Sequence, residues 1–166
     1  ELFEGFKDVK PEEKGKIAIW NAYFRKNGPA FHPRLAGADL SGLSLGEIVL
    51  DRADLTEVNF TGTNLSRASL NDTRMRGALL NGANLTAARM NHADLTNADL
   101  RRARLTNVRA RGAIFNGANL SETFMDGADL SRAAVKGAST ANPSRPGSRL
   151  KVRVKIKPVG ESSSPS

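Results

Sequence analysis

The chain of 166 residues contains no cysteine and only nine aromatic residues, among them one Trp and one Tyr. Without cysteine it cannot hold a disulfide framework, a thiolate zinc site or a thiol nucleophile. No apolar run approaches the roughly 18 residues that a membrane span requires, and no signal-peptide pattern is present. The first residue is Glu1 rather than Met, which suggests that an upstream segment has been removed. These features favour a soluble, cytoplasmic protein.

Patterns that carry catalysis or metal binding are missing as well. The sequence has two histidines, His32 and His92, in different contexts, and it has no HExxH, GxSxG, Walker or GxGxxG motif. Its many Asp and Asn residues recur with a short repeat, so turn hydrogen bonds account for them better than metal ligation does. We therefore expect no enzymatic activity, no cofactor and no metal site.

What the sequence does contain is an unbroken repeat of five residues. Twenty-one consecutive positions, spaced by five from Leu35 to Val135, hold fourteen Leu, three Met, two Phe, Val135 and Ala110. The 21 positions that lie three residues after a central position, from Ala38 to Ala138, and thus two before the next pentad's centre, hold fourteen Ala and three Thr. Asp, Asn or Arg is favoured between the two. Ser, Thr or Asn commonly follows the central residue, and Gly often comes next.

A period of five fits short extended segments separated by turns. Residues two apart in an extended segment point to the same side, so the Ala and Leu positions share one face, and the residues between successive pairs are turn formers. A helix advances by about 500° in five residues, about 140° past a whole turn, and would scatter the Leu side chains around its circumference. The repeat therefore excludes a helix, despite the helix propensity of Ala, Leu and Arg.

The run A(D/N)LXX from Ala38 to about Ala138 resembles the pentapeptide-repeat proteins. This resemblance implies an all-β solenoid, a right-handed quadrilateral β-helix with four pentads in each square coil. The 21 pentads then give about five coils, stacked about 4.8 Å apart. The segment before the repeat also resembles the one that precedes many such repeats, through Trp20-Asn21, Asn27, Pro33, Leu35 and Gly37.

Three segments follow from these patterns. Residues 1–32 are predicted to form an N-terminal cap segment with a helix over about 11–26, because the unpaired edges of a solenoid must be covered. Pro11 suits the first turn of that helix, Gly28 ends it, and Ile17, Trp20 and Phe24 share one face. Trp20 and Phe24 are the predicted structural cap residues. Residues 33–140 are predicted to form the β-helix, and residues 141–166 a basic tail.

The tail carries most of the net positive charge. The formal net charge is +8; residues 141–166 hold six basic residues and one acidic residue, whereas residues 33–140 hold thirteen and eleven. After a breaker-rich linker, residues 150–157 alternate apolar and basic side chains, which predicts one amphipathic strand. An isolated strand is unstable in water, so three alternatives stay open. The strand covers the last coil, it joins the sheet edge of another protein, or it remains a flexible basic tail that associates with nucleic acid.

Outward side chains twenty residues apart should stack on one side of the solenoid. Arg34, Asp54, Arg74 and Asp94 then form a ladder of opposite charges. Because each exposed pair contributes only about 0.2–1 kcal/mol, we interpret the ladder as a structural feature that favours the correct coil register.

The coil over residues 96–115 is rich in arginine, and Arg109 should stack directly on Arg89. An anion or a partner carboxylate would relieve this like-charge contact. Phe124 takes an outward position that the family usually gives to Asp or Asn, where it could serve a cap or a dimer contact. With the tail, these positions supply the candidate partner-binding residues: Arg89, Arg101, Arg102, Arg104, Arg109, Arg111, Phe124, Arg149, Lys151, Arg153, Lys155 and Lys157.

The regular rod, the lack of catalytic motifs and the basic tail favour a non-enzymatic binding or scaffold subunit that docks onto a larger protein assembly. The resemblance implies an alternative, since some family members are similar in shape to duplex DNA and bind type II topoisomerases. That mimicry needs a strongly negative surface, and this chain is positive. Weak, non-specific binding of nucleic acid is a third hypothesis, because basic residues are present but no aromatic residues are interleaved with them. The sequence leaves the oligomeric state open.

Overall fold

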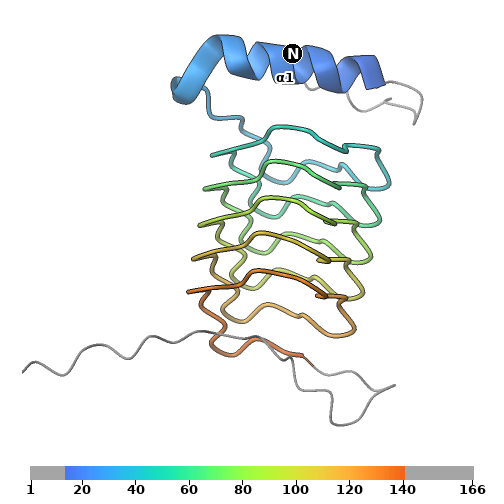
Figure 1. Cartoon of the computed structure of the whole chain (residues 1–166), viewed down its shortest axis with the longest axis vertical. Helices are drawn as coiled ribbons and strands as arrows, with labels where there is room; N and C mark the ends of the chain where they lie inside the picture. The colour runs from blue at the N-terminus through green and yellow to red at the C-terminus, as the bar shows by residue number, and fades with distance from the viewer. Residues whose placement is uncertain (1–13, 141–166) are drawn as a thin grey trace, which may run out of the picture.

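The computed structural model of this chain describes residues 14–140. The start of the predicted helix over 11–26 and the whole predicted tail strand over 150–157 lie outside the described residues. The described part comprises helix α1 (Lys14–Asn27), a short 3₁₀ helix, η2 (Gly28–Ala30), and a stack of coils. Figure 1 shows α1 lying across one end of that stack.

Each coil of the stack takes twenty residues and has four sides. Parallel bridges join residues that are twenty apart, beginning with Arg34 and Asp54 and ending with Asn119 and Ser139. Every pentad contributes one bridging residue, just before its central residue, and then a two-residue turn. The extended pieces that the sequence predicts are shorter than ordinary strands. Within residues 14–140 these extended segments pair through isolated bridges. Each side of a coil is only one pentad long, so the chain turns again after a few residues.

The four sides of the rod are defined by their bridging residues. The first face carries residues 34, 54, 74, 94, 114 and 134; the second, 39, 59, 79, 99, 119 and 139; the third, 44, 64, 84, 104 and 124; and the fourth, 49, 69, 89, 109 and 129. The two turn residues that follow a face form a corner with the same ordinal. Residues 51–52, 71–72, 91–92, 111–112 and 131–132 therefore form the fourth corner.

The interior is filled by the central residue of each pentad and by the small residue two positions earlier. Both central Phe residues and the central Leu and Met residues of the inner coils are fully buried. Burial of one such side chain contributes about 1.5–3 kcal/mol. Where Thr replaces Ala, its hydroxyl is satisfied by the backbone: Thr63 Oγ1 donates to the Leu40 carbonyl at 2.7 Å. The core is one continuous column of side chains along the rod.

The polar residues of the repeat hold the corners. At Asp54, Oδ1 accepts two hydrogen bonds from Thr56, one from the backbone N–H at 3.2 Å and one from the hydroxyl at 2.7 Å. Asp or Asn before the central residue, and Ser or Thr after it, close the turn together. The second turn residue adopts a left-handed φ, 61° at Arg52 for example, which explains the frequent Gly at that position.

Helix α1 packs on the first coil through one face. Ile17, Trp20 and Phe24 are buried, while Ile19 is 66% exposed. Phe31, just after η2, lies against the rings of Trp20 and Phe24, with ring centroids 6.0 Å and 5.7 Å apart. The apolar spacing in α1 therefore faces the same core that the pentads fill.

Three hydrogen bonds join α1 to the backbone of the third corner and the fourth face. The Trp20 indole Nε1 donates to the Val49 carbonyl at 2.7 Å. Asn21 Nδ2 donates to the Glu47 carbonyl at 2.9 Å, and Asn21 Oδ1 accepts from the Val49 N–H at 2.9 Å. The Asn21 amide thus offers the first coil a donor and an acceptor, as the backbone of a preceding coil would.

We expect these contacts to stabilise the protein measurably. Trp20→Ala should lower the free energy of unfolding by about 3–5 kcal/mol because it removes a large buried side chain. Asn21→Ala should lower it by about 1–3 kcal/mol because the Val49 N–H loses its acceptor. Ile19→Ala, at an exposed position of the same helix, is the control and should change it by less than about 0.5 kcal/mol. Urea unfolding followed by circular dichroism measures all three; equal effects of Trp20→Ala and Ile19→Ala would contradict this expectation.

Candidate functional site

The six candidate arginines of the β-helix are spread over two faces and two corners. All six are exposed. The five basic candidates of the tail, Arg149, Lys151, Arg153, Lys155 and Lys157, lie outside the described residues. The structure places Arg101 and Arg102 in the second corner, Arg104 on the third face, Arg89 and Arg109 on the fourth face, and Arg111 in the fourth corner.

Three of these arginines are already ion-paired. All three occupy turn positions, and their carboxylate partners lie in the same pentad or in the following coil. Such exposed pairs contribute at most about 1 kcal/mol each, yet an incoming partner would have to compete with a carboxylate in place. The pairs are Arg101 Nη2 to Asp99 Oδ2 at 2.7 Å, Arg102 Nε to Glu122 Oε2 at 3.1 Å, and Arg111 Nε to Asp129 Oδ2 at 3.1 Å.

Arg89, Arg104 and Arg109 form no ion pair with any residue in 14–140. All three are bridging residues, and Arg89 and Arg109 are bridge partners, so the stacked like charges that the sequence predicts are present. Asp129 follows Arg109 on the fourth face, but its Oδ2 pairs with Arg111 instead. The three guanidinium groups therefore remain available to a carboxylate or phosphate.

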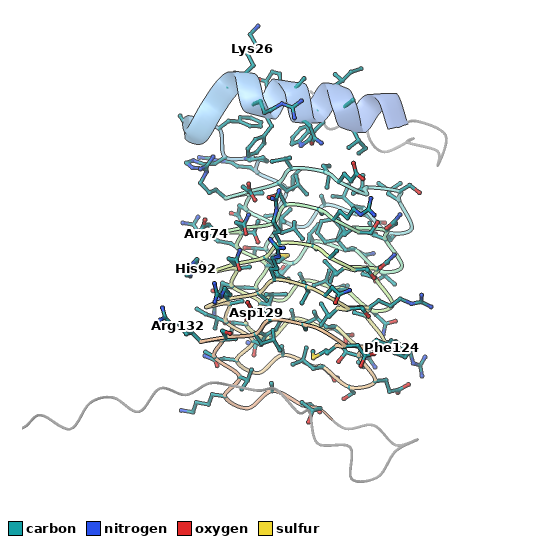
Figure 2. All side chains as sticks on the ribbon, in the orientation of Figure 1. Lys26, Arg74, His92, Phe124, Asp129 and Arg132 are labelled. Atoms are coloured by element: carbon teal, nitrogen blue, oxygen red, sulfur yellow. The ribbon has the colours of Figure 1, made fainter. Side chains whose placement is uncertain are left out.

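Phe124 lies beside these arginines. It is the bridge partner of Arg104 on the third face, and it is 55% exposed. Figure 2 shows it on the opposite side of the rod from Arg74 and His92. Exposed aromatic and arginine side chains are the types enriched at the energetic centres of protein interfaces. We refer to Arg89, Arg104, Arg109 and Phe124 together as the arginine surface.

The predicted charge ladder on the first face is stacked but not ion-paired. Arg34, Asp54 and Arg74 are successive bridge partners, yet no ion pair joins them in the described structure. Instead, Asp54 Oδ1 turns into its own corner, towards Thr56. The expectation of charge pairing along the column is therefore wrong, because the turn hydrogen bonds orient the carboxylate first.

The same turns lower the pKa of several aspartates. At Asp54, the hydroxyl and N–H of Thr56 hold the pKa of the carboxyl below its ordinary value, and the charges of Arg74 and Arg34 act in the same direction. At Asp99, the Arg101 guanidinium is the largest cause of the lowered pKa. Hydrogen-bond donors and positive charge both stabilise the carboxylate form. These carboxylates are therefore part of the turn structure.

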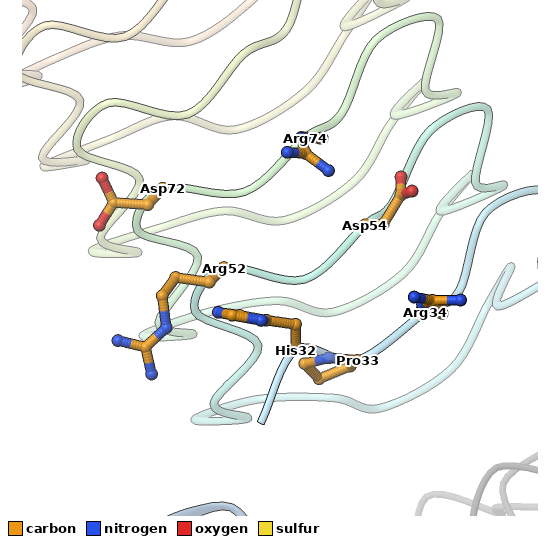
Figure 3. Close-up of a pocket in the computed structure, with 7 residues that line it drawn as sticks. All are labelled: His32, Pro33, Arg34, Arg52, Asp54, Asp72 and Arg74. Atoms are coloured by element: carbon orange, nitrogen blue, oxygen red, sulfur yellow. The ribbon is translucent and has the colours of Figure 1, made fainter. Parts of the chain in front are cut away.

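A pocket of about 510 Å³ lies where the fourth corner meets the first face, in the coils nearest α1. None of its arginines forms an ion pair within residues 14–140. The Nε of Arg52 is buried and has no hydrogen-bond partner there. We call this site the corner pocket. Figure 3 shows its lining: His32, Arg52 and Asp72 in one column, Arg34, Asp54 and Arg74 in the next, and Pro33 between His32 and Arg34.

The corner that carries Arg52 is held by a column of polar side chains. Asp51 Oδ1 accepts from the Asn71 N–H at 2.8 Å. Asn71 Oδ1 accepts from the Asn91 N–H at 3.1 Å, and Asn91 Oδ1 accepts from the Arg111 N–H at 3.1 Å. Each of these bonds joins two successive coils, so the first residue of each turn in the fourth corner holds the backbone in place. The second residue of the turn directs its side chain outward.

The sequence pattern does not bring the residues of the corner pocket together. It places Arg34 and Arg74 in a charge ladder, and it shows no relation between the two histidines. Two adjacent columns of outward residues could have indicated the pocket. Arg52 lies twenty residues after His32, in one column, and two residues before Asp54, in the next. Asn21 enters the sequence analysis only through the resemblance to the segment that precedes many such repeats. The residue pattern does not predict its hydrogen bonds to the edge of the first coil.

Within residues 14–140, no group of three His, Cys, Asp or Glu side chains could hold a metal ion. The same residues include no helix with both the length and the apolar character needed to cross a membrane.

Twenty-residue coils with four bridged sides define a solenoid of the pentad-repeat class. A family model described as the pentapeptide repeat region matches residues 48–134, more than half of the chain. The chain therefore belongs to the pentapeptide-repeat family. Proteins of this family form right-handed quadrilateral β-helices and are in general non-enzymatic.

Several solved structures are similar to this chain. A pentapeptide repeat protein of the Arabidopsis thaliana thylakoid lumen is 27% identical, with a TM-score of 0.31, over 77% of this chain and 73% of that one. HetL of the cyanobacterium Nostoc, involved in the regulation of heterocyst differentiation, is 29% identical, with a TM-score of 0.24, over 64% and 56%. QnrB1, a plasmid-mediated fluoroquinolone resistance protein, is 17% identical, with a TM-score of 0.41, over 64% and 72%. No curated protein matches the chain.

We expect the stability of the protein to fall in acid. A carboxyl with a lowered folded pKa stabilises the fold above its ordinary pKa of about 3.9, and this contribution is lost as the pH falls through the folded pKa. Asp99→Asn keeps an acceptor for the turn but neither titrates nor pairs with Arg101. It should lose at most about 1 kcal/mol at neutral pH and show a weaker pH dependence below about pH 4. Urea unfolding across this pH range tests the expectation, and superimposable profiles for variant and wild type would refute it.

Proposed function

We propose that this protein is a non-enzymatic binding subunit, a rigid rod that docks onto a protein assembly through the arginine surface. The observation that carries the proposal is the placement of three unpaired arginines and one exposed phenylalanine on two adjacent faces. Backbone bonds between coils hold these positions in a fixed array. A prearranged array loses little freedom when a partner binds, which favours affinity.

The chemistry of this surface favours an acidic protein partner. Arg89 and Arg109 are stacked one coil apart. Like charges at this short distance repel each other unless an anion lies between them. Carboxylates of a partner would supply that anion through paired, charge-assisted hydrogen bonds. Phe124 beside Arg104 adds apolar area that exposed charges alone do not provide.

The two ends of the chain have separate roles in this proposal. Helix α1 acts as an N-terminal cap with Trp20 and Phe24 as its anchors, because its contacts occupy a backbone edge that could otherwise pair with another chain. The basic residues within 149–157 provide a second attachment to the acidic partner. Faces and tail would then act together, which raises the overall affinity above that of either one.

Two other functions agree less well with the charge. Mimicry of duplex DNA needs a strongly negative surface, whereas residues 33–140 hold thirteen basic and eleven acidic residues. We therefore expect the protein to leave supercoiling by gyrase unchanged. Direct binding of nucleic acid through Lys and Arg would be non-specific and would weaken steeply with salt.

The double variant Arg89→Glu/Arg109→Glu tests the proposal. In affinity capture from native extract, the full chain should retain a defined set of proteins, and the double variant should retain it about tenfold less well, because repulsion replaces attraction. Arg25→Glu/Lys26→Glu reverses the same number of exposed charges on α1, outside the arginine surface, and should behave as the wild type. Binding to the main retained partner, purified, then gives the affinity ratio directly.

The outcomes separate the parts of the proposal. Loss of the partner on truncation to residues 1–140, with no effect of Arg89→Glu/Arg109→Glu, would overturn the role of the faces and leave the tail as the attachment. Equal losses with both double variants would mean that overall charge, and not this surface, is recognised. Retention of nucleic acid alone, released by moderate salt, would contradict the proposal in favour of non-specific nucleic-acid binding.

A further inference from the structure

The corner pocket is separate from the arginine surface in position and in shape. It lies in the coils nearest α1, between the fourth corner and the first face, and is hollowed to about 510 Å³. The arginine surface lies further along the rod, on the third and fourth faces. The corner pocket therefore shares no residue with the arginine surface.

Positive groups in the pocket outnumber the carboxylates that could neutralise them. Three arginines, Arg34, Arg52 and Arg74, line it together with two aspartates. Asp54, which lies between Arg34 and Arg74 on the first face, directs its Oδ1 to Thr56. No ion pair within residues 14–140 involves any of the three arginines. Their guanidinium groups can therefore donate to a ligand without first leaving a carboxylate.

Arg52 is distinguished by its side chain and not by its backbone. Its φ of 61° is the left-handed value that the second turn residue of each pentad adopts, as at Gly112 and Arg132 in the same column. Its Nε is buried without an acceptor in the described structure. A charged side chain with a buried donor that has no partner calls for an explanation, and a ligand bound beside it is one. The neighbouring His32 adds a second nitrogen-bearing group to the same wall.

We propose that the corner pocket binds a phosphate monoester group, held by Arg34, Arg52 and Arg74. The planar guanidinium fork matches phosphate oxygens in pairs, and a dianion satisfies several such forks at once. The volume of about 510 Å³ exceeds what a small carboxylate fills, and it leaves room for the group that carries the phosphate.

Calorimetric titration of the full chain, in buffer free of phosphate and sulfate, tests this assignment. Inorganic phosphate and O-phosphoserine should bind saturably at one site, and acetate should not. Arg52→Gly should weaken phosphate binding by about tenfold or more, because charge-assisted hydrogen bonds are lost. Glycine adopts a positive φ without strain, so this variant should fold. Arg132→Gly is the matched control: it has the same place in the column, a φ of 63° and the same loss of charge, and it should bind within about twofold of the wild type.

Arg74→Gln provides a second test at a bridging position, with Arg104→Gln as its control on another face. Only Arg74→Gln should weaken phosphate binding. Tighter binding of O-phosphoserine than of inorganic phosphate would identify the source as a phosphorylated side chain, and equal binding would identify a free anion. Unsaturable binding, equal effects of Arg52→Gly and Arg132→Gly, or binding of acetate as tight as that of phosphate would each overturn the proposal.

Discussion

Successive coils are joined by three sets of backbone hydrogen bonds, the first of them from the second turn residue, as from Arg52 N–H to the Asn71 carbonyl at 2.8 Å. A bridging N–H donates to a carbonyl 21 residues earlier, as Asp54 does to Pro33 at 2.8 Å, and a central N–H donates to a carbonyl 19 residues later, as Leu55 does to Arg74 at 2.8 Å. A slip of one residue would break all three sets and move the central side chains out of the core. The core, the corners and the outward columns therefore share one twenty-residue register.

A rod built in this way has a free edge at each end, and the two ends are treated differently. At the first coil, a single side-chain amide, that of Asn21, bonds both the Val49 N–H and the Glu47 carbonyl. At the last coil, no residue in 14–140 accepts a hydrogen bond from the N–H of Leu130 or Val135. The end opposite α1 is thus the one where another β segment could add. The three alternatives for the tail remain predictions.

The register explains which features could be predicted from the sequence. A period of five identifies the buried positions and the stacks, so the placement of Arg109 on Arg89 needs no coordinates. The apolar spacing predicts a helix over 11–26, and the structure has α1 at Lys14–Asn27. The period does not predict the direction in which an outward side chain turns. Asp54 could face Arg74 or Thr56 with equal spacing, and the hydrogen-bond geometry of the turn decides between them.

That preference of aspartate for its own turn also decides which positive charges are available to a ligand. With Oδ1 of Asp94 engaged by Thr96, Oδ2 pairs with a turn arginine, Arg76, at 3.2 Å. Within residues 14–140, every ion-paired arginine occupies a turn position, and no bridging arginine is paired.

A rod that is almost neutral by residue count therefore presents unpaired guanidinium groups on its flat faces. The arginine surface takes all three of its arginines from this bridging set, and the corner pocket takes Arg34 and Arg74 from it. Where the hydrogen bonds that close a turn orient its aspartate, as at Asp54, the bridging arginines beside it stay unpaired and can bind other molecules.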